Sequence, residues 1–119
     1  MMAATAIRDA LAFALPTWVL QFGRWTDDLN KATRFAVVRP VGGGPATLVR
    51  SPQFSVTLIG ADGDDATAAG AQADLVVRSL RDWRPSVGPV FNLQASEPVF
   101  VPTADSRPAF DIAVSALTT

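Results

Sequence analysis

Three acidic residues in the middle of the chain have a spacing that could bind a metal ion. Asp62, Asp64 and Asp65 resemble the start of a calcium-binding loop, in which alternate carboxylates bind the ion. The twelfth position of such a loop would be Ala73, where calcium coordination needs a glutamate. Because these acids also precede an apolar-periodic segment, we expect them to cap a helix rather than to bind a metal.

Two further motifs could carry chemistry. The glycine run 42–44 could cradle a phosphate, but a strand pattern follows it instead of a helix start with a lysine, so a hairpin loop is favoured. Asp105 and Asp111 could form the carboxylate pair of a glycoside hydrolase. No third polar group supports that pair. We therefore expect Asp105 to bond the backbone of its own turn and to pair with Arg107.

The composition removes most other catalytic groups. The 119 residues contain no histidine, cysteine or tyrosine, which excludes the commonest general acid–base group, a thiol nucleophile and most zinc or haem ligand sets. Any chemistry would have to use carboxylates, hydroxyls, arginines or Lys31. The net charge is −1 with acids and bases interleaved, which argues against strong nucleic-acid binding. A length of 119 residues predicts one domain, residues 1–119.

The N-terminal apolar stretch does not predict a membrane segment. Ala6 to Leu20 is interrupted by Arg8, Asp9 and Pro16, and it is too short to span a bilayer. It also lacks a basic leader and a small-residue cleavage site. We therefore expect no membrane association and no signal peptide.

Two segments have the periodicity of amphipathic helices. From Ala3 to Leu15, apolar residues recur at i, i+3 and i+4, and Pro16 ends the pattern. The second helix is expected from Asp65 to Asp82, with Asp64 as its N-cap. Its predicted buried stripe is Ala66, Ala69, Ala73, Val76, Val77 and Leu80.

Alternating apolar residues elsewhere predict strands. The segments are 18–23, 34–40, 53–60, 90–95, 98–101 and 109–116, with 90–95 and 98–101 either separate or one bent strand. Pro40 and Pro52 are expected to close off a long-looped hairpin, and the segment 34–40 is apolar on both faces, as in an inner strand. The fold class is therefore α+β: one mixed, mostly antiparallel sheet with two helices packed on it.

These segments also carry a family resemblance. They include Phe35-Ala-Val-Val-Arg-Pro-Val-Gly-Gly-Gly-Pro, Val56-Thr-Leu-Ile-Gly-Ala, Pro89-Val-Phe and Pro102-Thr-Ala-Asp-Ser-Arg-Pro-Ala-Phe-Asp-Ile-Ala-Val. In these motifs and in the order of its elements, the chain resembles the tail terminator (minor tail, gpU-like) proteins of long-tailed bacteriophages. The resemblance covers residues 7–116.

The resemblance implies a mechanical function. Such proteins form a ring, usually a hexamer, that caps the tail tube, stops polymerisation of the tube protein and offers a surface to the head-side connector. DNA passes through the lumen without sequence-specific binding. The implied location is the tail or neck of the virion, assembled in the host cytoplasm. No catalysis and no cofactor are implied.

A ring needs side surfaces that contact copies of the same chain, and the sequence suggests where these lie. Arginines beside strand ends, the glycine loop and a tryptophan next to a polar segment are the interface candidates. They are Arg24, Trp25, Arg34, Arg39, Gly42, Gly43, Gly44, Arg50, Asp105 and Arg107. Trp83 is expected to cover one end of the core, and Phe91 and Phe100 are expected within it.

Two other functions fit the same residues. The chain could be a different neck or head-completion protein that binds the tail without terminating it. It could also be a small α+β enzyme or ligand-binding domain, which would have a deep polar pocket in a stable monomer.

Overall fold

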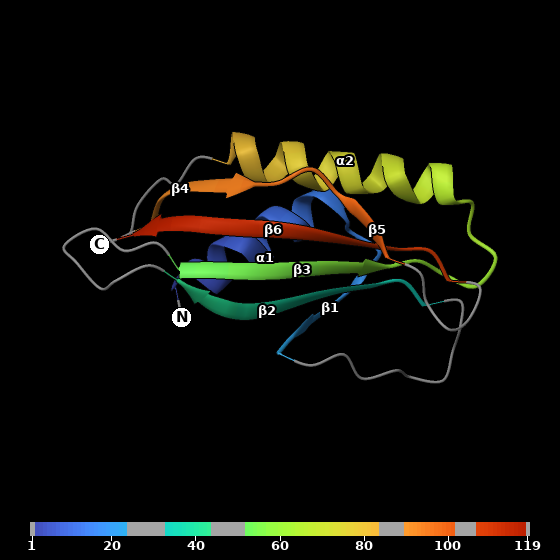
Figure 1. The fold of residues 1–119 in the computed structure, drawn as a ribbon, viewed down its shortest axis with the longest axis horizontal. Coiled ribbons are helices and arrows are strands. Elements are labelled where there is room, and N and C mark those ends of the chain that lie inside the picture. Colours follow the sequence, from blue (N-terminus) through green and yellow to red (C-terminus); the bar gives the residue numbers. More distant parts are fainter. Residues whose placement is uncertain (1, 24–32, 44–51, 84–89, 102–106, 119) are drawn as a thin grey trace.

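The computed structural model describes residues 2–23, 33–43, 52–83, 90–101 and 107–118, and Figure 1 shows their arrangement. Two helices and six strands lie in these segments, and each helix is followed by three strands. They are α1 (Met2–Ala14), β1 (Val19–Phe22), β2 (Phe35–Gly43), β3 (Pro52–Ile59), α2 (Ala66–Asp82), β4 (Val90–Ala95), β5 (Val99–Val101) and β6 (Ala109–Thr118). The predicted elements are confirmed, most of them to within one residue at each end.

The six strands form a single mixed sheet. Its order is β1-β2-β3-β6-β4, and β5 also pairs with β6. The strands β1 and β2 are parallel, whereas every other pair is antiparallel. The predicted fold class, a mostly antiparallel α+β domain, is therefore confirmed.

The strand β2 runs further than the sequence suggested. Pro40 was expected to end it, but β2 continues to Gly43 through a register shift between Pro40 and Gly42. A proline is tolerated there because Pro40 lies beyond Val38, where the parallel pairing with β1 ends among the described residues. Gly42 has φ +112°, a backbone conformation that favours glycine. The glycine run thus begins inside the hairpin strand.

The strands β4 and β5 behave as one interrupted strand along the same edge of β6. The backbone N–H of Ser96 donates to the carbonyl of Ala113 at 2.8 Å. The Oγ of Ser96 accepts from the Ala113 N–H at 2.9 Å. Ser96 therefore continues the pairing across the break, which favours the bent-strand alternative.

Both helices cover one face of the sheet. The apolar residues Ile7, Ala10, Leu11 and Leu15 share one buried cluster with inward-facing residues of β3 and β6, and Ala14 packs against it half-buried. From α2, the buried residues are Ala69, Ala73, Val76 and Leu80. Ala66, which was also expected there, is exposed because it is the first residue of the helix, before its inner face meets the sheet. Trp83 packs at the edge of this core, as predicted.

The opposite face has a much smaller buried cluster. Phe35, Val37 and Ile59 form it at one end of the sheet, which explains why β2 reads as apolar on both faces. Phe100 was expected in the core, but its side chain is 54% exposed, because β5 lies at the edge of the sheet. Its ring makes an edge-to-face contact with Phe110 at 5.5 Å between centroids. The side chain of Phe91 lies outside the described residues.

Candidate assembly surfaces

An ion pair joins the start of β2 to the loop before α2. The Arg34 Nε donates to Asp64 Oδ2 at 2.8 Å, and Arg34 Nη2 donates to Oδ1 at 2.9 Å. Asp64 Oδ2 also accepts from the backbone N–H of Ala61 at 2.8 Å. Such a two-pronged arrangement fixes both the distance and the orientation of the partners. Arg34, a predicted interface residue, is thus already engaged within its own chain.

This pair also corrects the predicted start of α2. The N-cap is Asp65, whose side chain accepts from the N–H of Thr67 at 3.2 Å. Asp64 was expected in that role, but its carboxylate faces Arg34 instead. The hydrogen bond from Arg34 lowers the pKa of the Asp64 carboxyl, and the same bond raises the pKa of the Arg34 guanidinium.

Arg107 lies inside the protein, with 3% of its surface exposed. Its Nε donates to the carbonyl of Gly60 at 2.9 Å, and its Nη2 donates to the carbonyl of Thr33. Its guanidinium lies 5.5 Å from the centre of the Phe35 ring. Arg107 therefore ties together the chain before β2, the end of β3 and the start of β6, and it is not on the surface of the monomer.

Gly60 makes this junction possible. Its N–H donates to the carbonyl of Pro108 at 2.8 Å. A Cβ at this position would lie 2.9 Å from Pro108 Cγ and 3.2 Å from Asp64 Oδ2, closer than ordinary carbon contacts. The close approach of two backbones requires glycine here.

The face of the sheet opposite the helices is polar along its centre. Thr57 Oγ1 donates to Asp111 Oδ1 at 2.6 Å between neighbouring strands. Asp111, which was considered as a catalytic carboxylate, is thus bonded across β3 and β6. Arg39 follows Phe35 and Val37 on this same face, and its side chain is exposed. Arg39 and Gly42 therefore lie on accessible parts of the hairpin, as an interface role requires.

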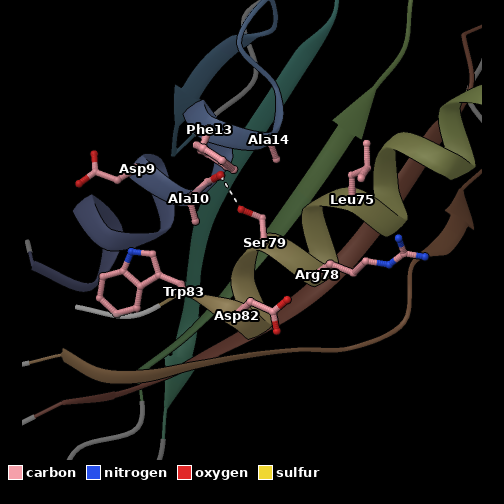
Figure 2. A pocket seen from close by; sticks show the side chains of 9 residues that line it. All are labelled: Asp9, Ala10, Phe13, Ala14, Leu75, Arg78, Ser79, Asp82 and Trp83. Atoms are coloured by element: carbon pink, nitrogen blue, oxygen red, sulfur yellow. Dashed lines mark hydrogen bonds between the residues drawn. The ribbon is translucent and has the colours of Figure 1, made fainter. Parts of the chain in front are cut away.

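A groove runs between the two helices on their outer side (Figure 2). Its volume is about 620 Å³, and its lining is mostly apolar. The lining residues are Asp9, Ala10, Phe13, Ala14, Leu75, Arg78, Ser79, Asp82 and Trp83. The Oγ of Ser79 donates to the carbonyl of Ala10 at 3.0 Å and so fixes the floor where the helices meet.

Two apolar side chains stand exposed beside this groove. Phe13 is 86% exposed on α1, and Leu75 is 45% exposed on α2. Neither residue belongs to the buried apolar stripe of its helix. A large apolar residue outside such a stripe is the sequence signal that could have identified this exposed surface. The groove itself needs the packing of two distant helices and was not predicted.

The predicted interface residues do not form one cluster in the structure. Arg34 and Arg107 lie near the junction at Gly60, whereas Arg39, Gly42 and Gly43 lie along β2. Five further candidates lie outside the described residues, namely Arg24, Trp25, Gly44, Arg50 and Asp105. The expected pair of Asp105 with Arg107 therefore lies outside them too. Among the residues that the structure describes, no group of three potential metal ligands occurs. In the same part of the chain, no helix is long and apolar enough to cross a membrane.

Comparison with known proteins gives one assignment. A family model described as phage tail termination protein matches residues 3–119. No curated protein matches the chain.

Proposed function

We propose that this chain, which belongs to the phage tail termination protein family and is thus a structural component of the phage tail, ends the tail tube as a ring of identical copies. In this role the ring blocks the addition of further tube protein and offers its other side to the head-side connector. DNA passes through its centre without sequence-specific contacts. Assembly takes place in the host cytoplasm.

The observation that carries this proposal is the family match over nearly the whole chain. The family is structural rather than catalytic. The arrangement of the described residues supports the same conclusion, because three of the five candidate carboxylates make structural bonds. Asp64 binds Arg34, Asp65 caps α2, and Asp111 accepts from Thr57.

The shape of the fold supports a ring. Copies of one chain close into a ring only through two different, complementary surfaces on each copy. In this chain the exposed large apolar residues fall in separate places. Phe13 and Leu75 flank the helix groove, Val99 and Phe100 lie on β5, Val41 lies at the hairpin, and Val19 and Phe22 lie on β1. The helices and strands that carry these residues share one buried core, which holds the surfaces in fixed places.

The test is electron microscopy of particles made without this protein. We expect overlong tails, because nothing then stops the tube from growing. Tails of normal length that are detached from full heads would contradict termination and would indicate a neck protein that joins the head. Restoring normal lengths with a plasmid copy of the gene is the control.

A further inference from the structure

We propose that the groove between α1 and α2 receives β5 of the neighbouring copy, with Phe100 as the inserted side chain and Glu97 paired to Arg78. This inference rests on the proposed ring and names the contact that closes it. The occupant is therefore a second copy of this chain.

The two surfaces complement each other in shape and polarity. The groove is concave, with an apolar floor and wall formed by Ala10, Ala14 and Trp83, and with Phe13 and Leu75 at its rim. The segment β5 projects at the sheet edge with Phe100 more than half exposed. An aromatic side chain that enters an apolar pocket is the usual centre of a protein interface.

The charges at the two surfaces also match. Arg78 lies in the wall of the groove, and Glu97 lies three residues before Phe100. Both side chains are exposed, and neither has an ion-pair partner among the described residues. The acids near the groove, Asp9 and Asp82, already pair with adjacent arginines. Arg78 is therefore the cation that is available to an incoming carboxylate.

The two surfaces cannot meet within one copy. Phe100 packs on Phe110, whose ring lies against Gly70 in the N-terminal half of α2. The groove is lined by the C-terminal half of α2, from Leu75 to its cap at Trp83. The contact is thus between different patches on two copies, which is the head-to-tail type that can close into a ring.

Cross-linking tests this contact directly, because the chain has no cysteine of its own. Tails are assembled with the double variant Arg78→Cys, Glu97→Cys and treated with a short bifunctional maleimide. Both positions are exposed, so the fold should tolerate the changes. We expect a ladder of covalent oligomers of this chain that extends beyond the dimer. Each single variant and the pair Arg78→Cys, Gln53→Cys should give no ladder.

If tails of normal length give no ladder, the proposed contact is wrong. The proposed termination function would then still stand. Cross-links to the tube protein instead of to other copies would also overturn it. Overlong tails in particles that lack the chain remain the separate test of termination.

Charge reversal gives a second test that does not depend on cysteines. Arg78→Glu and Glu97→Arg, each alone, should increase the fraction of overlong tails several-fold, because like charges would then face each other. The double variant Arg78→Glu, Glu97→Arg should restore normal lengths. The control double variant Arg78→Glu, Asp74→Arg has the same net charge, but it should not restore normal tail lengths. Single variants that cap tails as well as the wild type would overturn the contact.

Discussion

The two faces of the sheet differ in what they bury, and the difference separates stability from assembly. The face toward the helices carries a continuous apolar core from both helices and most strands. The opposite face has a small buried cluster of Phe35, Val37 and Ile59, with the buried Ala109 paired beside Ile59. Further along β3 and β6 this face carries Thr57, Asp111 and Ala113, none of which is buried. We infer that substitutions on the first face unfold the protein, whereas exposed positions can alter assembly while the fold persists.

The largest expected effect comes from the helix-covered face. Ile112→Ala removes a fully buried side chain from β6 and should lower the free energy of unfolding by about 2–5 kcal/mol. Ala113→Ser, the next residue on the exposed face, should change it by less than about 0.5 kcal/mol. Urea denaturation of both variants measures the contrast. Equal losses would contradict the division between the two faces.

A smaller effect is expected at the buried arginine. Arg107→Met keeps much of the apolar stem but leaves the carbonyls of Gly60 and Thr33 without their charged donor. We expect a loss of about 2–3 kcal/mol in the free energy of unfolding. Arg107→Lys keeps the charge but loses the guanidinium fork. It should therefore retain only part of the stability that Arg107→Met loses. Unfolding midpoints equal to that of the wild type would show that this junction does not hold the strands.

The ion pair between Arg34 and Asp64 should give at most about 1 kcal/mol, because Arg34 is partly exposed to solvent. Its pH dependence identifies it. The pKa of Asp64 is lower in the folded state than in the unfolded state, so the stabilisation is fully present above the unfolded value of about 3.9. It is lost as the pH falls through the lower folded value.

The comparison of wild type with Asp64→Asn measures this contribution. The wild type should be the more stable of the two at neutral pH, and the difference should shrink in acid. Arg34→Ala should show the same trend. A difference that grows on acidification would have the wrong sign for this pair.

The smallest effect on stability is expected at Arg39, on the exposed face. Arg39→Glu should leave the unfolding midpoint unchanged, because the side chain is exposed and no ion pair within the described residues involves it. It should still hinder ring closure or tube capping, which tail lengths in electron micrographs report. Arg39→Lys should cap normally. Normal capping by folded Arg39→Glu would remove this residue from the assembly surface.

Local patterns predicted most of the fold. Period-2 alternation identified the strands, and the faces of β3 and β6 followed directly from it. The parallel pairing of β1 with β2 was not predictable from the sequence pattern, because it depends on how distant segments pack. The N-cap of α2 is Asp65 rather than the predicted Asp64, because Asp64 binds Arg34. This too depends on the packing of segments that are distant in the sequence.

The candidate surfaces were less predictable than the fold. Arg107 looked like a turn residue, but its burial depends on three segments meeting at Gly60. Phe100 looked like a core residue, because the sequence shows that β5 is a strand but not that it lies at the sheet edge. The helix groove arises from the packing of α1 on α2. Its only local signal is that Phe13 and Leu75 depart from their apolar stripes.

If this protein stops the growth of the tail tube, as we propose, it should shorten tubes that are polymerising in solution. Purified chain is added at increasing ratios to tube protein that is elongating in solution, and tube lengths are measured by electron microscopy. We expect the mean length to fall as the ratio rises, with the chain bound at one end of each tube. Lengths that do not depend on the added chain would contradict the claim.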